Sequence, residues 1–212
     1  MLKHKKKFPM QLIYSHVMNN IREYFSVIIV LLIGIVLGAI IINISNEDIK
    51  LSLQSYINDF ITNISEIENI DKIGLLKNIF INNLLIVLTI TFFGSTVIGI
   101  PIVYGIVAYK GFCLSYTIGS IIAVLGNSKG ILFALSGLFL QNLIYIPCIL
   151  ALAVSGIKLY KSIVKDRRRE NIKLEILRHI LFSLVIGAVL LVGTLLEAYV
   201  STNLIMVYSH YI

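Results

Sequence analysis

Apolar runs long enough to cross a lipid bilayer recur along this chain, and they constrain its fold more than any other feature. A helix needs about 20 apolar residues to cross the hydrocarbon core of a bilayer. The first run covers residues 24–43, and further apolar regions cover 79–126, 131–156 and 179–200. Because 79–126 is too long for one span and fits two, the sequence predicts an all-α, polytopic membrane protein with five transmembrane helices.

The composition agrees with this class and excludes two others. Of the 212 residues, 58% are hydrophobic and 14% are charged, and the mean hydropathy is +0.91. A soluble domain has about 45–50% apolar and about 25% charged residues, so a soluble enzyme and a disordered tail protein are excluded. The net charge is +7, and the basic residues that produce it lie mostly between the apolar runs. This distribution indicates membrane topology rather than a nucleic-acid partner. Cys113 and Cys148 lie inside apolar runs, so we expect small hydrophobic side chains rather than a disulfide.

The charges between the apolar runs predict the orientation of the chain. Residues 1–23 carry five basic residues and one acidic residue, and residues 157–178 carry eight basic and three acidic residues. Residues 44–78 carry six acidic residues and three lysines. Because basic loops remain in the cytoplasm, we expect the N-terminal arm and 157–178 inside the cell. The loop 44–78 and the tail 201–212 are then expected outside, with the N-terminus in and the C-terminus out.

Two amphipathic helices are expected outside the spans. The first lies within the basic arm, where Met10, Ile13, Tyr14, Val17 and Ile21 recur at helical spacing, and it is predicted to lie on the inner membrane face. The second lies in the extracytoplasmic loop 44–78, where apolar residues recur every three or four positions. Its stripe either packs on the bundle or the outer lipid headgroups, or forms a docking surface for an extracytoplasmic protein. The candidate partner-binding residues are Leu53, Tyr56, Ile57, Phe60, Ile64 and Ile67.

The sequence leaves the turn between the second and third spans open. A turn at Gly99–Pro101 places Lys110 inside the third span, at a cost of about 2.5–3.5 kcal/mol for a lysine at a helix centre. A turn at Tyr109–Gly111 avoids this cost but leaves a third span of only about 15 residues, which is short for a bilayer. We expect a broken segment over 99–111 that dips into the inner leaflet under cover of the bundle. The compact bundle 79–200 then contains spans at about 79–100, 102–126, 131–156 and 179–200.

Small residues recur at four-residue spacing in two of the spans. They are Gly34 and Gly38 in the first span and Gly111, Ser115, Gly119 and Ala123 in the third. Small side chains at this spacing let helix backbones approach closely inside a bilayer. We expect these residues to pack the bundle internally, and self-association through them is the other interpretation.

Polar residues within or at the edges of the spans form a further set of candidates. They are Asn82, Asn83, Lys110, Gln141, Asn142 and Glu197. Polar groups inside a membrane are functional candidates, although amides also satisfy the backbone of broken helices, as Gln141 and Asn142 would near Pro147. The four histidines are scattered, and the chain has no HExxH, GxSxG or phosphate-loop motif. We therefore expect no enzymatic activity, no metal and no cofactor.

With these residues in view, the chain resembles the stage II sporulation protein M family, integral membrane proteins of spore-forming Firmicutes. The resemblance covers nearly the whole chain and depends on the order of four local matches within the five-span layout. These are Asn82-Asn83, Lys110-Gly111-Phe112, the run from Leu140 to Pro147, and the run from Glu197 to Ser201. Relatives often have Asn where this chain has Lys110, so the resemblance implies no shared role for that position.

The resemblance implies a role in the engulfment stage of sporulation. Members of the family are regarded as membrane scaffolds that recruit peptidoglycan-degrading partners, the stage II sporulation proteins D and P. The implied location is the plasma membrane of the sporulation septum, on the mother-cell side. A small transporter or channel subunit, with Lys110, Gln141, Asn142 and Glu197 along a polar path, is the alternative.

Overall fold

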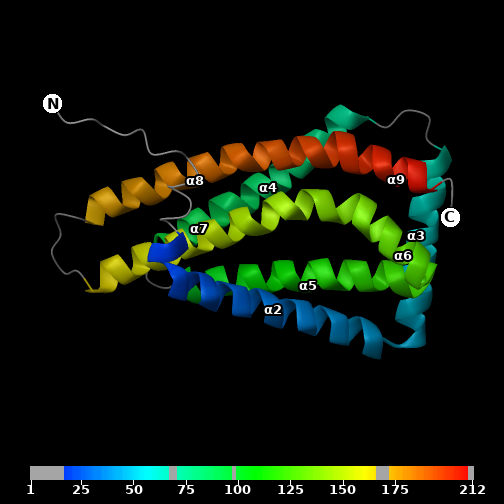
Figure 1. Ribbon diagram of the computed structural model, residues 1–212, viewed down its shortest axis with the longest axis horizontal. Coiled ribbons are helices and arrows are strands. Elements are labelled where there is room, and N and C mark those ends of the chain that lie inside the picture. The colour runs from blue at the N-terminus through cyan, green and yellow to red at the C-terminus, as the bar shows by residue number, and fades with distance from the viewer. Residues whose placement is uncertain (1–16, 67–70, 97–98, 166–171, 210–212) are drawn as a thin grey trace.

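The described residues of this computed structural model are 17–66, 71–96, 99–165 and 172–209. They form helices and short connections, with no strand among them. Long helices run side by side along the molecule, and one helix lies across one end (Figure 1). Five helical segments are long and apolar enough to cross a membrane. The all-α class and the number of candidate spans are therefore confirmed.

Three spans are single helices and two are composite. The single helices are α2 (Ile21–Ile44), α4 (Lys72–Gly94) and α5 (Gly99–Leu125). The fourth span joins α6 (Asn127–Ala134), the π-helix η1 (Leu135–Phe139) and α7 (Leu140–Lys165). The fifth joins α8 (Ile172–Leu195), the π-helix η2 (Leu196–Ser201) and α9 (Thr202–Ser209). The remaining helix, α3 (Glu47–Glu66), lies across the end of the bundle.

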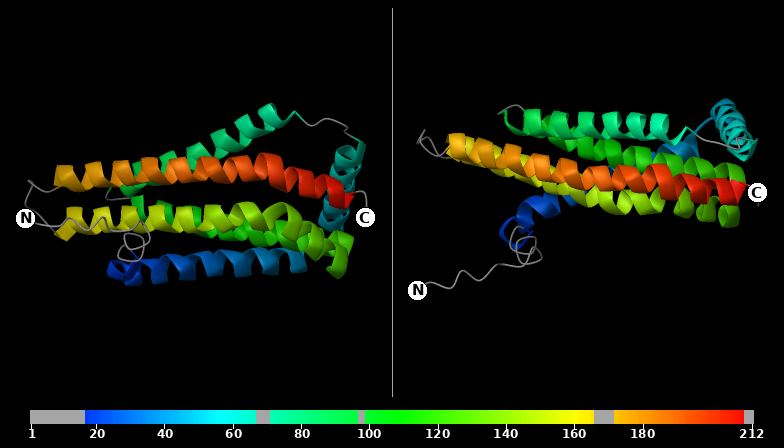
Figure 2. Two further views of the ribbon diagram at one scale, coloured as in Figure 1. Left: turned by 45° about the horizontal axis from the view of Figure 1, so that its top comes forward. Right: turned by 90° about the horizontal axis from the view of Figure 1, so that it is seen from above.

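The helix ends gather at two opposite ends of the bundle. The starts of α2, α5 and α8 lie toward one end, and α3, the α5–α6 turn and the end of α9 lie at the other (Figures 1 and 2). At the first end, the Lys161 ammonium lies 2.6 Å from the Glu23 carboxylate and joins α7 to α2. The start of α2 and the end of α7 therefore share one end, and the acidic helix α3 lies at the opposite end.

The turn between the second and third spans differs from the expected broken segment. α4 ends at Gly94, and α5 is unbroken from Gly99 through Lys110 to Leu125, so the expected break over 99–111 is wrong. Pro101 lies in the first turn of α5. Backbone N–H groups in the first turn have no acceptor within the helix, so a proline there costs no helix hydrogen bond. Lys110 lies in the middle of α5, where it is half-buried and within range of the charge of Glu197.

The start of α4 also differs from the expected boundary at residue 79. The Asp71 carboxylate caps the helix by accepting hydrogen bonds from the backbone N–H groups of Ile73 (3.2 Å) and Gly74 (3.0 Å). This cap starts the helix at Lys72, about two turns before the apolar run begins. The predicted interfacial helix of the basic arm falls almost entirely within residues 1–16, outside the described part of the chain.

The core lies where α7 contacts α2, α4, α5 and α8. Leu152, Ala153 and Val154 of α7 are completely buried, as are Val27 of α2 and Ile90 of α4. Large apolar side chains instead cover the outer surface of the bundle, such as those of α2 and α8. A water-soluble monomer rarely exposes apolar area on this scale, so this surface fits contact with lipid.

Candidate functional site

Helix α3 forms the first candidate site, because it lies outside the bundle of spans (Figure 2). Glu47 and Asp48 stand in its first turn, where negative charge favours a helix start. Its apolar stripe is divided between two roles. Ile57 is only 7% exposed and packs with Ile121 of α5 and Phe133 of α6. Thus α3 is held against the bundle by part of its predicted docking stripe.

The other predicted docking residues are more accessible. Tyr56 is 70% exposed and Phe60 is 41% exposed, whereas Leu53 and Ile64 are half-buried. Ile67 lies outside the described residues. The stripe is therefore anchored at its centre and exposed at the two aromatic side chains.

A cavity of about 350 Å³ lies between α3 and the end of the bundle. Leu53, Tyr56, Ile57 and Phe60 of α3 line one side of it. The other side is lined by residues of α5, α6, η1 and α9, among them Ile205 of α9. The arrangement offers an apolar recess beside two exposed aromatic side chains, which is a surface suited to binding a protein rather than to catalysis.

The second candidate site is a polar cluster between the spans. The Tyr145 hydroxyl of α7 donates a hydrogen bond to Oε2 of Glu197 at 2.8 Å and lies 3.5 Å from Oγ1 of Thr194. The Asn83 amide of α4 also approaches this hydroxyl. Lys110 of α5 is close enough for its charge to interact with that of Glu197. The cluster thus draws on four of the five spans.

The structure brings together only some of the predicted intramembrane polar residues. Asn83, Lys110 and Glu197 join the cluster, whereas Asn82 is exposed on α4. The Asn142 Nδ2 donates to the Leu138 carbonyl at 2.7 Å, a local contact to the π-helix η1. The buried Oε1 of Gln141 has no hydrogen-bond partner among the described residues.

Sequence reasoning missed Tyr145 and Thr194, which complete the cluster. Tyr145 lies one helical turn after Gln141, and Thr194 lies three residues before Glu197. Helical spacing from the chosen polar residues was therefore the signal that could have found both.

The small residues lie in the contact between α2 and α5. A Cβ atom on Gly34 would meet the Ala108 carbonyl, and one on Gly38 would meet the Phe112 carbonyl. Conversely, a Cβ atom on Gly111 would meet the backbone of α2 at Leu31. These three glycines therefore allow direct contact between two helix backbones inside one molecule.

The remaining members of this set follow the same face of α5 toward its end. The Ser115 Cβ lies near Gly38, and Gly119 contacts the side chain of Ile42. Ala123 is exposed and lines a small cavity with Ile42 and Lys50. Contact within the chain thus accounts for Ser115 and Gly119, while Ala123 is the member left on the surface.

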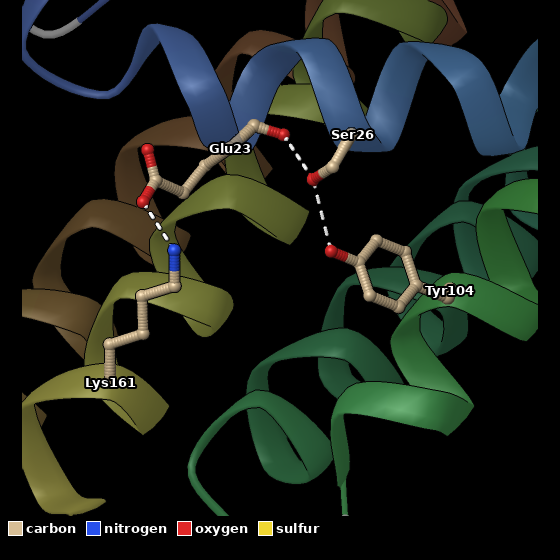
Figure 3. Close-up of polar contacts among 4 residues, drawn as sticks. All are labelled: Glu23, Ser26, Tyr104 and Lys161. Atoms are coloured by element: carbon tan, nitrogen blue, oxygen red, sulfur yellow. Dashed lines mark hydrogen bonds and ion pairs between the residues drawn. The ribbon is translucent and has the colours of Figure 1, made fainter.

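A polar network joins three spans near the start of α2 (Figure 3). Besides its ion pair with Lys161, Glu23 offers its backbone carbonyl to Oγ of Ser26, at 2.8 Å. Ser26 Oγ lies in turn 3.0 Å from the Tyr104 hydroxyl of α5. α2, α5 and α7 are therefore held together by polar contacts as well as by packing.

A buried Ser–His contact at the same end also escaped the sequence analysis. Oγ of Ser155 in α7 lies 2.8 Å from Nδ1 of His179 in α8, and His179 is 2% exposed. The His179 ring packs over the close crossing of Gly94 and Gly156. This contact fixes α4, α7 and α8 where they cross, and no spacing in the sequence connects residues so far apart.

Comparison with known proteins identifies the family. The family model described as stage II sporulation protein M matches residues 27–202. The chain belongs to the stage II sporulation protein M family. The match extends from α2 to the start of α9 and reaches all five candidate spans, three of them over their whole length. None of the curated proteins and none of the solved structures compared with the chain matches it. The family and the apolar helices together describe a sporulation-related, multi-pass membrane protein.

Proposed function

We propose that this member of the stage II sporulation protein M family is a membrane scaffold for engulfment. It recruits peptidoglycan-degrading partners, the stage II sporulation proteins D and P, to the septal membrane on the mother-cell side. It is not an enzyme and needs no cofactor for this role. The observation that carries the proposal is α3, which presents an apolar recess and exposed aromatic side chains at one end of the bundle.

The proposal requires α3 to face the cell wall. The end of α7 and the start of α8 carry Lys158, Lys161 and Lys173 and lie at the end of the bundle opposite α3, and basic segments favour the cytoplasmic side. The N-terminus is then inside, the C-terminus outside, and α3 extracytoplasmic. This is the side of the membrane on which a peptidoglycan-degrading enzyme works.

The chemistry of α3 supports protein binding better than lipid binding. Tyr56 and Phe60 lie one turn apart on the same face, and aromatic side chains often dominate binding energy at protein interfaces. The exposed charges of α3 are mostly acidic, including Asp48 and Asp59, whereas helices that bind anionic lipid carry basic residues.

The test combines Tyr56→Asp with Phe60→Asp in the full-length protein during sporulation. We expect this variant to accumulate normally and to lose recruitment of fluorescent protein D or P to the septum. Asn58→Asp is the control, because it adds negative charge on the opposite face of α3. Ile57 is left unchanged, since a charge at this buried position would detach α3. Normal recruitment by the accumulated double variant would refute the proposal.

A transport function has weaker support. It needs Lys110 and Glu197 to line a continuous polar path. Instead, the Glu197 carboxylate accepts a hydrogen bond from Tyr145 and lies within range of the charge of Lys110, so the carboxylate already has a partner within the bundle.

A further inference from the structure

A small polar pocket lies between α7 and α8, toward the end of the bundle opposite α3. Its volume is about 140 Å³. The residues that line it are Ser155, Lys158 and Leu159 of α7 and Glu175, Arg178, His179 and Phe182 of α8. The pocket therefore brings two cations together with a hydroxyl and an imidazole group.

The inner side of the pocket is formed by a packed contact between the two spans. Oγ of Ser155 lies 2.8 Å from Nδ1 of His179. His179 and Leu159 are both only 2% exposed. These buried groups hold α7 against α8, so the pocket belongs to the fold of the bundle.

The charges around the pocket leave positive charge without a partner. The Arg178 guanidinium donates to the Glu175 carboxylate at 2.8 Å. The Lys158 side chain is exposed and has no ion-pair partner among the described residues. The other described acidic residue at this end, Glu23, is paired with Lys161. The pocket therefore favours an anion, and the described residues at this end of a second copy offer no free carboxylate to supply it.

The pocket lies at the boundary between the hydrocarbon core and the lipid headgroups. The apolar run of the fourth span ends at Gly156, and that of the fifth span begins at His179. Lys158 lies about 3 Å beyond Gly156 along α7, and Arg178 directly precedes His179. Both cations thus stand where apolar sequence changes to basic sequence, which is the depth of the lipid phosphate groups.

The face of α8 that carries Arg178 is also a lipid-facing surface. Leu174 lies four residues before Arg178 and Leu181 lies three residues after it, so the three side chains share one face. Leu174 is 51% exposed and Leu181 is 54% exposed. Exposed apolar side chains on a span fit contact with lipid. A lipid molecule is therefore adjacent to the pocket, and Phe182, one turn further into the membrane, offers it an apolar wall.

We propose that this pocket binds the phosphate group of an anionic phospholipid, with Lys158 and Arg178 as its cationic ligands. Glu175 engages only Nη1 of Arg178, and a guanidinium has five N–H donors, so others remain for phosphate oxygens. Basic pockets between spans bind acidic lipid headgroups in other membrane proteins. The inference is independent of the scaffold function, because it uses neither α3 nor a protein partner.

The test measures lipid adducts on the purified, delipidated full-length protein by native mass spectrometry. Phosphatidylglycerol is the anionic probe, and phosphatidylethanolamine is the zwitterionic control. We expect phosphatidylglycerol to bind roughly fivefold more tightly, the effect of about one unit of charge at a membrane surface. Equal affinity for the two lipids would overturn the proposal.

A pair of lysine variants locates the binding site. Lys158→Gln is expected to weaken phosphatidylglycerol binding by roughly fivefold, and it leaves every described ion pair intact. Lys50→Gln is the matched control with no expected change, because Lys50 also lines a cavity of about 140 Å³ but belongs to α3, at the opposite end of the bundle. Equal affinity of the two variants contradicts the proposal.

Two competitors distinguish the lipid from other anions. Inorganic phosphate and a short glutamate peptide are each added at the concentration of the phosphatidylglycerol. We expect the lipid adduct to persist, because neither competitor has an acyl chain to lie against Phe182 and the exposed leucines of α8. Displacement by phosphate would show a site for a free anion, and displacement by the peptide would show a site for an acidic protein segment. Either displacement overturns the lipid assignment.

Discussion

The Tyr145 hydroxyl is the point at which several spans exchange polar contacts. It bonds Glu197 of η2, approaches Asn83 of α4, and lies beside Thr194 of α8. Glu197 in turn interacts with Lys110 of α5. Polar groups within a bilayer must find partners inside the protein, so the cluster fixes the relative positions of helices that apolar packing alone would leave free to slide.

Replacing Tyr145 with Phe tests this role. The variant loses a hydrogen bond to a carboxylate, and we expect its folding to weaken by about 1–2 kcal/mol. The measurement is the midpoint of thermal unfolding in detergent, followed by fluorescence-detected size exclusion. Tyr109→Phe is the matched control, because Tyr109 is 64% exposed on α5. Equal midpoints for the two variants would show that the cluster does not hold the spans.

The residues of this cluster differ in how readily they can be identified from the sequence. Lys110 and Glu197 stand out because a charge within an apolar run is costly. Tyr145 and Thr194 do not, because both residue types are compatible with a span, and Tyr145 is 52 residues from its partner Glu197. Hydropathy shows only whether a residue type is compatible with a membrane span. Which polar residues pair with one another depends on how the helices pack together.

The contact between α2 and α5 depends on backbone rather than on side chains. Gly34 and Gly38 of α2 lie against carbonyl groups of α5, and Gly111 of α5 lies against the Leu31 carbonyl of α2. Without a hydrophobic drive between helices in lipid, close backbone packing of this kind supplies much of the attraction.

Two glycines of α5 provide a paired test of this contact. Gly111→Leu places a side chain against the Leu31 carbonyl, and we expect loss of most of the monodisperse protein recovered in detergent. Gly105→Leu lies on the same helix with open space around its Cβ position, and we expect near-normal recovery. Equal recovery of both variants would contradict the α2–α5 packing described above.

The helices themselves were largely predictable, and their ends were less so. The number of spans follows from hydropathy, because each apolar segment of about 20 residues is long enough to cross the bilayer once. The start of α4 depends on the Asp71 cap, and the start of α5 on a proline that fits its first turn. The π-helices η1 and η2 have no signature in hydrophobic periodicity, since each adds a single wide turn within an apolar run.

The topology of the whole molecule predicts which side of the membrane each end contacts. Asp59 of α3 and Lys158 near the end of α7 are exposed, and α3 lies at the end of the bundle opposite the end of α7. In a background with Cys113 and Cys148 replaced by alanine, we expect a membrane-impermeant maleimide to label Asp59→Cys in intact protoplasts. Lys158→Cys should be labelled only after permeabilisation. The reverse pattern would invert the orientation and remove the basis for docking on α3.

The orientation of α3 limits where a partner can act. α3 lies across the bundle rather than along it, and only Ser45 and Asn46 separate it from the end of α2. A helix lying flat rises only about 10–12 Å above its support, so a protein that binds α3 is captured at the lipid surface. An enzyme recruited in this way must span the remaining distance to the cell wall with its own chain. The scaffold would therefore set the place of peptidoglycan cleavage along the membrane, and the partner would set its height above it.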